Sequence, residues 1–333
     1  EMLRVQFRKS LKKFIIVNDI IHIEIIVCTE FNEPLKYSLD PSAMTLSLLE
    51  NGLDSVGNVV EIIRFTSSED VNYITLRAPC KAGCFYLKVE VCVENKHLAI
   101  ISSEFTVSKS RNCLEINYTL LQCYRPFTIE GSNRTLYIKE DYGATLGSHV
   151  YDCSIILFEF LCSGVSSFTP QSRFLELGAG CGLIGIYLAA INISQLPVIV
   201  TDKQSQLDLL RDNILLNGVS DHCVPLELCW ESEQHLQLVQ ERMRVLWSGQ
   251  GMDFLLASDV LYDSEAARAF FSLVRRLATA GSTRLLLAQR LRNDQQRVSV
   301  EEQATQWGFG ARRLCEREAV VLWELDVQLI DCN

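Results

Sequence analysis

The segment FLELGAGCG, residues 174–182, joins an apolar run typical of a buried strand to the start of an apolar helix. Its glycines, Gly178, Gly180 and Gly182, allow a turn in which backbone N–H groups come close to a ligand. A dinucleotide-binding fingerprint would place its third glycine at position 183, where Leu183 stands, so the spacing is E-x-G-x-G-x-G. The segment therefore predicts a strand, a ligand-binding loop and a helix, with weak support for a dinucleotide as the ligand.

Strands and helices alternate on both sides of this loop. This alternation predicts an α/β fold, a Rossmann-like parallel sheet with helices on both faces. Two further runs near the end of the chain are close enough to form an antiparallel hairpin, which gives a seven-strand sheet with an antiparallel edge strand. The predicted strands are residues 173–177, 198–202, 224–229, 253–258, 283–289, 310–316 and 319–325, and the predicted helices are residues 153–161, 182–192, 204–217 and 264–279.

The first third of the chain has a different pattern. Apolar and polar residues alternate with period two, most clearly at residues 87–93 and, after a turn at 94–96, at 98–101. Six or seven such short strands predict an all-β sandwich. The sandwich loosely resembles immunoglobulin-like modules of the filamin type, although no motif fixes that likeness.

The two patterns predict two domains. We expect the β-sandwich at residues 1–110 and the α/β domain at residues 111–333, the latter opening with a hairpin whose strands are residues 123–130 and 135–140. Lysine usage agrees with this division, since every lysine except Lys203 lies at or before Lys139. We also expect the sandwich to be a surface on which a partner docks.

Composition narrows the class of protein. The 333 residues carry 41 acidic and 31 basic side chains, and the net charge of −10 argues against an electrostatic nucleic-acid footprint. No uninterrupted apolar run is long enough to span a bilayer, and the basic start of the chain lacks the cleavage site of a secretory signal. The 13 cysteines include no C-x-x-C pair, so we expect no metal site and reduced thiols, in the cytoplasm or the nucleus.

An acid follows the glycine loop at the end of the next predicted strand. There the short carboxylate of Asp202 can accept hydrogen bonds from both hydroxyls of a ribose. The loop together with Asp202 resembles motif I of the seven-β-strand S-adenosylmethionine-dependent methyltransferases. The resemblance implies that the cofactor is S-adenosylmethionine and that Glu176, Gly178, Gly180 and Asp202 bind it.

Two further matches narrow the resemblance to family 16 of the protein methyltransferases. Residues 147–152, GSHVYD, lead into the first helix, and residues 258–262, SDVLY, contain a D-x-x-Y signature after the fourth strand. The resemblance implies that Asp259 and Tyr262 are catalytic and that Tyr151, Trp230 and Ser258 contact the cofactor. Tyr151 stands where the family usually has tryptophan, Glu231 follows Trp230 in place of glycine, and Ser258 stands where alanine is common.

The resemblance implies methylation of a lysine in a protein substrate. A lysine amine with a pKa near 10.4 is neutral in only about one molecule in 10³ at pH 7, so the site must desolvate and orient it. Asp259 favours the ammonium form, and we therefore expect it to position the amine rather than to deprotonate it. Protein-histidine or small-molecule methylation and a cofactor-binding scaffold without activity are the alternatives, whereas the D-x-x-Y signature argues against a nucleobase substrate.

Overall fold

The computed structural model describes residues 3–327, apart from 9–13, 17, 30–33, 37–38, 51, 61, 69–70, 109–121, 143, 165–167, 280, 292–299 and 318. The chain divides into two compact units. Unit 1 comprises residues 1–128 and 137–144, and unit 2 comprises residues 129–136 and 145–333. The predicted domain boundary at residue 110 lies outside the described residues.

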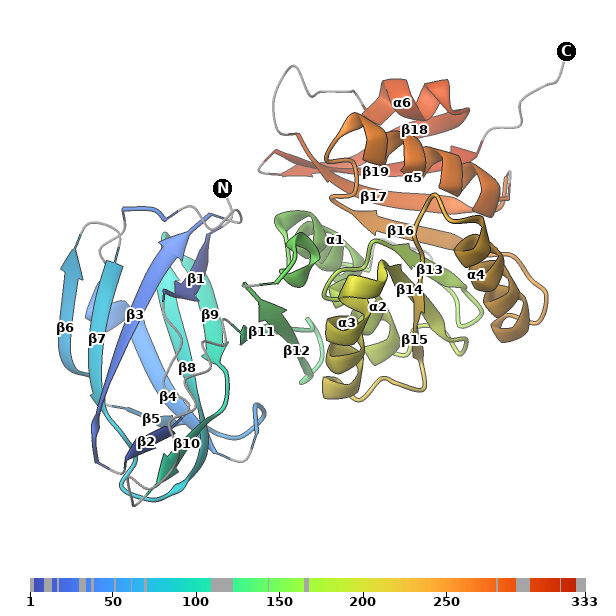
Figure 1. The fold of residues 1–333 in the computed structure, drawn as a ribbon. Helices are drawn as coiled ribbons and strands as arrows, with labels where there is room; N and C mark the ends of the chain where they lie inside the picture. The colour runs from blue at the N-terminus through green and yellow to red at the C-terminus, as the bar shows by residue number, and fades with distance from the viewer. Residues whose placement is uncertain are drawn as a thin grey trace, which may run out of the picture. The chain divides into compact units, whose positions relative to one another are not determined.

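Unit 1 is an all-β sandwich of two sheets (Figure 1). Buried aliphatic and aromatic side chains from both sheets, among them Ile23, Ile74, Leu87 and Phe105, form one core. One sheet has the order β1 (Arg4–Phe7), β3 (Ile20–Cys28), β7 (Val71–Arg77), β6 (Ile62–Ser68). The other has the order β12 (Thr135–Asp141), β11 (Gln122–Thr128), β9 (Lys96–Ser102), β8 (Gly83–Val93), β10 (Phe105–Ser108), β2 (Phe14–Ile16), with β4 (Met44–Glu50) paired to β8 and β5 (Asn58–Val59) paired to β4.

The hairpin expected at residues 87–101 is present as β8 and β9. Glu94 and Asn95 form its turn with positive φ angles of 50° and 63°, as a tight two-residue hairpin connection requires. The later hairpin, β11 and β12, continues the same sheet, because β11 pairs with β9 through Cys123 and Tyr124. Most of this second hairpin therefore clusters with unit 1 and not with the α/β unit.

Unit 2 contains the seven-strand sheet that the sequence predicts. The five strands β13 to β17 are parallel to one another. Each begins and ends within two residues of its predicted run, because it is a short apolar segment between turn residues. Their order is β15 (Cys223–Glu227), β14 (Val198–Asp202), β13 (Phe174–Leu177), β16 (Phe254–Ser258), β17 (Arg284–Arg290), followed by β19 (Val320–Val327) and β18 (Phe309–Arg317).

The antiparallel strand is not at the edge where we expected it. β19 runs antiparallel to β17 and lies between β17 and β18, so the edge strand β18 has the same direction as the parallel strands. The physical reason is the connection before the hairpin. The chain leaves β17 and passes through helix α6 (Val300–Gln306), so it reaches the outer position first and returns along β19.

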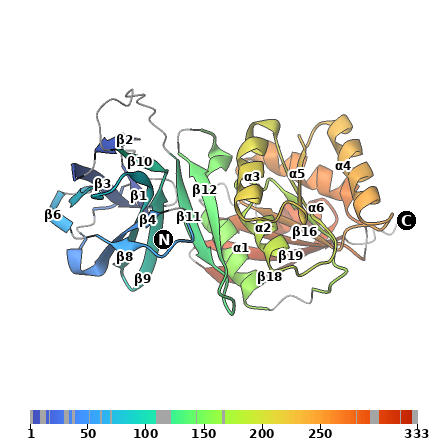
Figure 2. The same cartoon turned by 90° about the horizontal axis from the view of Figure 1, so that it is seen from below.

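Helices cover both faces of this sheet (Figures 1 and 2). α4, α5 and α6 pack against one face of the sheet and share a core with its side chains. The helices contribute Val239, Phe270, Phe271 and Ala304 to this core, among others. The other face carries α1, α2 and α3, and Phe158 of α1 meets Tyr187 of α2 edge to face at 5.0 Å. The helices are α1 (Asp152–Cys162), α2 (Leu183–Ala190), α3 (Gln204–Leu216), α4 (Glu233–Leu246) and α5 (Ser264–Leu277), with the short 3-10 helices η1 (Pro41–Ala43) in unit 1 and η2 (Leu146–Ser148) before α1.

Helices α4 and α6 were not predicted from the sequence. α4 begins after Ser232, whose hydroxyl accepts the N–H of His235, and it buries Leu236, Val239 and Met243 at helical spacing.

Within the described part of the chain, no helix is long and apolar enough to span a bilayer. Nor do three or more potential ligand side chains gather into a metal site among those residues.

Candidate active site

The residues predicted to bind and react lie at one end of the parallel sheet in unit 2, where β13, β14 and β16 finish. In open parallel sheets of this kind, ligands bind at the loops that follow the carboxyl ends of the strands. Gly178 follows β13, Asp202 ends β14, and Asp259 follows β16 directly. The loops that follow the strands therefore bring together residues up to 81 positions apart in sequence, as the register of β13 with β14 and β16 requires.

The glycine loop has a backbone that other residues rarely adopt. Gly178, Gly180 and Gly182 have φ angles of 65°, 55° and 84°. At Gly180 a Cβ atom would also lie 2.9 Å from the carbonyl oxygen of Gly147, so the loop and the segment before α1 approach each other closely. This tight turn explains why glycine recurs at every second position.

Asp202 holds the glycine loop directly. Its Oδ2 accepts the Gly180 N–H at 2.7 Å, and its Oδ1 accepts the Lys203 N–H at 2.7 Å. Burial raises the pKa of the Asp202 carboxyl, although these two N–H groups and the Lys203 charge act in the opposite direction. Each oxygen keeps a lone pair beyond these bonds, so the carboxylate can still accept hydroxyl groups of a ligand.

Glu176 lies beneath the loop and faces helix α2. Its side chain is buried, and its Oε2 accepts the Gly185 N–H, the third backbone donor of α2, at 2.9 Å. Burial raises the pKa of Glu176 to about 8, the nearby Asp202 charge adds to the rise, and the Gly185 bond acts against it. Glu176 therefore supports the start of α2, and its contact with the cofactor stays a prediction.

The loop after β15 and the loop after β16 meet at Gly178. A Cβ atom on Gly178 would lie 3.0 Å from Val260 Cγ1 and 3.6 Å from Trp230 Cζ2. The Trp230 ring is partly buried and meets Phe270 of α5 edge to face at 5.7 Å. The structure thus brings together Trp230, the glycine loop and the Asp259–Tyr262 segment.

Asp259 has an unusual backbone. Its φ is 53°, in the left-handed region, and its N–H donates to Ala288 O at 2.8 Å. It does not cap the following helix, because the Asp263 side chain accepts the N–H groups of Glu265 and Ala266 at the start of α5. The carboxylate of Asp259 instead accepts a bond from Gln289, while Tyr262, three residues on, is 51% exposed.

The remaining predicted contacts lie around the start of α1. Tyr151 is the residue before α1, and its hydroxyl donates to Leu146 O at 2.8 Å. Ser258 ends β16, and its hydroxyl lies 2.8 Å from the hydroxyl of Ser154 on α1. α1 is therefore fastened to the carboxyl end of the sheet, and cofactor contacts of Tyr151 and Ser258 stay predictions.

Sequence reasoning missed the pairing of Asp152 with Arg290, whose charge it took to be solvated, and the place of Gln289 at this end of the sheet. Asp152, buried at the start of α1, pairs with Arg290 at the end of β17, where Nη1 and Oδ2 are 3.1 Å apart. Gln289 beside it is buried and bonds the Asp259 loop. The available signal was a polar pair, Gln289 and Arg290, directly after the apolar run LLLA at residues 285–288.

Comparison with known proteins decides the family. A family model described as lysine methyltransferase, methyltransferase family 16, matches residues 130–304, just over half of the chain. The chain belongs to this family. The resemblance expected from the sequence is confirmed, and so is the enzyme class that it implies.

Curated relatives of the chain carry related names. It is 28% identical over 209 residues to protein N-lysine methyltransferase METTL21A of Danio rerio, which covers 59% of this chain and 88% of that protein. It is 31% identical over 140 residues to protein-lysine N-methyltransferase EEF2KMT of Homo sapiens, which covers 41% of this chain and 42% of that protein. Among solved structures, the T. thermophilus 16S rRNA N2 G1207 methyltransferase matches 81% of this chain and 58% of its own, with 14% identity and a TM-score of 0.44.

Proposed function

We propose that the carboxyl end of the unit 2 sheet binds S-adenosylmethionine. The residues fit this cofactor because Asp202 has acceptor capacity beyond its two backbone bonds, and because the positions Gly178, Gly180 and Gly182 have no side chain to keep a ligand away from the backbone. When bound, the cofactor supplies a methyl group on a positively charged sulfur. The residues that would hold it are Tyr151, Glu176, Gly178, Gly180, Asp202, Trp230 and Ser258.

The substrate that we propose is a lysine side chain of a protein. Support comes from the family match and from the relatives METTL21A and EEF2KMT, both named as protein-lysine methyltransferases. Asp259 would orient the incoming amine by hydrogen bonding, and Tyr262 would shape its approach. A nucleic-acid substrate has no support in the net charge of −10.

A single observation carries the assignment of Asp259 and Tyr262. Val260, which lies between them in sequence, is the side chain that a Cβ on Gly178 would touch at 3.0 Å. The D-x-x-Y segment is therefore adjacent to the proposed cofactor loop, where an amine must arrive for methyl transfer. Proximity of this kind is the main contribution that a positioning carboxylate makes to rate.

The test is transfer of labelled methyl groups from S-adenosylmethionine to proteins of a cell lysate, with the labelled residue located by mass spectrometry. We expect labelled lysine, and a rate that rises toward alkaline pH because the amine must lose its proton. Asp259→Asn should lower the rate about 100-fold, equivalent to about 2.7 kcal/mol, with the affinity for S-adenosylhomocysteine unchanged within about twofold.

Other outcomes of this experiment decide against parts of the proposal. A rate that levels off near pH 7, with labelled histidine, would assign protein-histidine methylation in place of lysine methylation. A normal rate in Asp259→Asn would remove Asp259 from the reaction. If no protein is labelled under any condition while S-adenosylhomocysteine still binds, the chain is a cofactor-binding scaffold.

For unit 1, we propose an immunoglobulin-like module that docks the protein substrate, in the cytoplasm or the nucleus. Its two-sheet architecture supports the likeness. Val59 in the edge strand β5 and Val56 just before it are 76% and 96% exposed, and they supply apolar surface at this edge. The compartment stays a prediction from the cysteine content of the sequence. The double variant Val56→Ser, Val59→Ser should slow lysate labelling at least about threefold. The matched control is exposed Val245→Ser on α4, and equal rates for the two variants would contradict docking at this edge.

A further inference from the structure

We propose that Gln289 is a positioning residue that holds Asp259 in place, an inference that rests on the proposed role of Asp259 toward the lysine amine. Gln289 is the last residue but one of β17, and it is only 3% exposed. Its side chain reaches from β17 to the loop after the neighbouring strand β16. The amide nitrogen donates to Asp259 Oδ1 at 3.0 Å and to Arg290 O at 3.3 Å, and the amide oxygen accepts the Leu261 N–H at 2.9 Å.

These bonds span the turn that carries the D-x-x-Y segment. Asp259 has the left-handed φ of 53°, a conformation that costs energy for a residue other than glycine and persists only where the surroundings enforce it. The backbone enforces one end, because the Asp259 N–H donates to Ala288 O at 2.8 Å. Gln289 fixes the side chain of the same residue and the backbone two residues later. Its amide thus sets both the carboxylate and the path of the chain into Tyr262.

The chemistry at position 289 calls for an amide. Leu261 N–H needs an acceptor and the Asp259 carboxylate needs a donor, and a primary amide offers one of each. This requirement determines the orientation of the amide. In the reverse orientation the Gln289 NH₂ group would face the Leu261 N–H, and neither of these two donors would have an acceptor. A glutamate would place a second carboxylate against Asp259, and a methionine would keep the length but remove both bonds.

The residues around Gln289 have other partners or are apolar, or end in a hydroxyl, so they do not take over the role of this amide toward Asp259. The neighbouring Arg290 directs its guanidinium to buried Asp152, with Nη1 and Oδ2 3.1 Å apart. Across the strand pair, β19 places Val321 opposite Gln289, and on the other side β16 ends in Ser258, opposite Ala288. Asp259 is therefore the titratable group to which the Gln289 amide donates, and a titratable side chain at 289 would couple to it.

The experiment compares Gln289→Met and Gln289→Glu with wild type in three measurements. These are the initial rate of labelled methyl transfer to lysate proteins at pH 6, 7 and 8, calorimetric affinity for S-adenosylhomocysteine, and amide hydrogen exchange of a peptide that spans residues 259–262. Gln237→Met and Gln237→Glu on α4, where Gln237 is exposed, are the matched controls. Asp259→Asn is measured in parallel.

We expect Gln289→Met to slow transfer about 10- to 100-fold and to accelerate exchange at residues 259–262, with affinity for S-adenosylhomocysteine within about twofold of wild type. In Gln289→Glu the two carboxylates repel each other, which raises the pKa of the pair. A protonated glutamate regains a donor and an acceptor, so the rate of this variant relative to wild type should increase as the pH falls from 8 to 6. The Gln237 variants should match wild type throughout.

Three results would overturn the proposal: a wild-type rate in Gln289→Met, a ratio for Gln289→Glu that does not change with pH, or a loss of cofactor affinity as large as the loss of rate. If Gln289→Met fails to fold, the pH ratio of Gln289→Glu and its hydrogen exchange decide alone. A wild-type rate in Asp259→Asn contradicts the proposed role of Asp259. An inactive Asp259→Asn beside a fully active Gln289→Met contradicts only the positioning by Gln289.

Discussion

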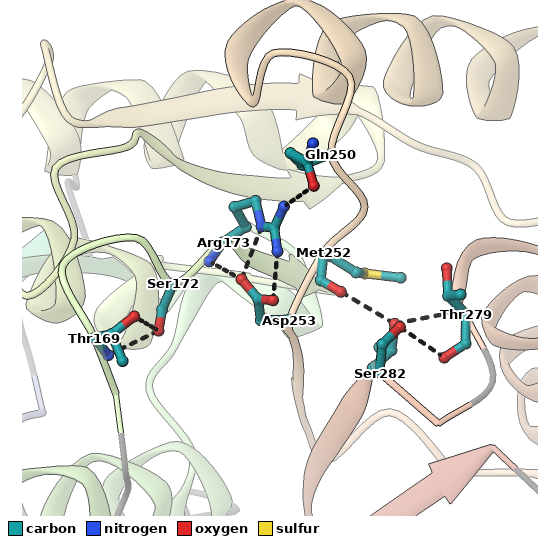
Figure 3. Close-up of polar contacts among 9 residues, drawn as sticks. Thr169, Ser172, Arg173, Gln250, Met252, Asp253, Thr279 and Ser282 are labelled. Carbon is teal, nitrogen blue, oxygen red and sulfur yellow. Dashed lines mark hydrogen bonds and ion pairs between the residues drawn. The ribbon is translucent and has the colours of Figure 1, made fainter.

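At the amino end of the unit 2 sheet, Asp253 is held by a guanidinium, whereas at the carboxyl end Glu176 and Asp202 are held by backbone N–H groups. Arg173 precedes β13 and Asp253 precedes β16, and the two form a forked pair: Nε donates to Oδ2 at 2.8 Å and Nη2 to Oδ1 at 2.6 Å (Figure 3). The Arg173 N–H also donates to Oδ2 at 2.8 Å, so one carboxylate fastens the starts of two adjacent strands.

The two ends differ in the sign of the pKa shift. At the amino end, burial acts to raise the pKa of Asp253, but the bonds and charge of Arg173 outweigh it and the pKa is lowered. At the carboxyl end burial dominates, and the pKa values of Glu176 and Asp202 are raised. Carboxyls with raised pKa values often lie at sites that bind ligands, so we expect the carboxyl end of this sheet to serve the cofactor and the amino end, with its matched charges, to serve stability.

The largest effect that we expect from this difference is in the pH dependence of Glu176→Gln. A carboxyl whose pKa is about 8 in the folded state and 4.5 otherwise takes up a proton on folding between these pH values. Wild type should therefore lose unfolding free energy as the pH rises through this window, by at most about 1.4 kcal/mol per pH unit from this group. The variant lacks this term, so its stability relative to wild type should increase from pH 5 to pH 8 in urea titrations.

The control for that prediction is Glu241→Gln on the exposed surface of α4. Its stability relative to wild type should stay constant over the same range. A constant difference for Glu176→Gln as well would show that the buried carboxyl is not protonated at neutral pH. The contrast between the two ends of the sheet would then be one of geometry alone.

The next effect in size concerns binding. Asp202→Ala removes the carboxylate that we assign to the ribose hydroxyls, and it should weaken S-adenosylhomocysteine by about 1.5 to 3 kcal/mol in calorimetry. Because burial already disfavours the Asp202 charge, we expect the unfolding free energy to change by less than about 1 kcal/mol. Equal losses of affinity and stability would mean that Asp202 only supports Gly180.

The amino end should show the reverse separation. Asp253→Ala removes three hydrogen bonds from Arg173, and after allowance for partial exposure we expect a loss of about 1 to 2 kcal/mol of stability. Affinity for S-adenosylhomocysteine should not change. Because the pKa of Asp253 is lowered, its contribution is present above its usual pKa of 3.8 and is lost as the pH falls below it, so the difference from wild type should shrink in acid. Exposed Asp221→Ala is the control.

The two ends of the sheet also show which parts of the unit 2 fold and of the candidate site the sequence could predict. The glycine loop, Asp202 and the D-x-x-Y segment are local patterns next to apolar strands, so their places at the strand ends followed from the strands. Helix α4 was missed because its buried side chains are only three, and exposed Leu238 and Val245 blur its apolar face. The place of β19 inside the sheet depends on which position the chain fills first, which no local pattern encodes.

Gln289 could not be found from sequence for a different reason. Its partners are set by the left-handed backbone of Asp259, which lies 30 residues away on a neighbouring strand. A glutamine at the end of an apolar strand is compatible with solvent exposure, and only the fold shows that it is buried. The same holds for Arg290 and Asp152, which are 138 residues apart.

The smallest effect that we expect concerns Ser258, which stands where the sequence resemblance led us to expect alanine. Its hydroxyl lies 2.8 Å from that of Ser154, a bond that fastens α1 to the carboxyl end of β16. If this bond is its main role, Ser258→Ala and Ser154→Ala should each cost about 0.5 to 1 kcal/mol of stability. The double variant should then cost little more than either, because both remove the same bond. S-Adenosylhomocysteine affinity should stay within about twofold. A loss of affinity confined to Ser258→Ala would instead establish the cofactor contact that the sequence predicted, and would make Ser258 part of the ligand-binding end of the sheet.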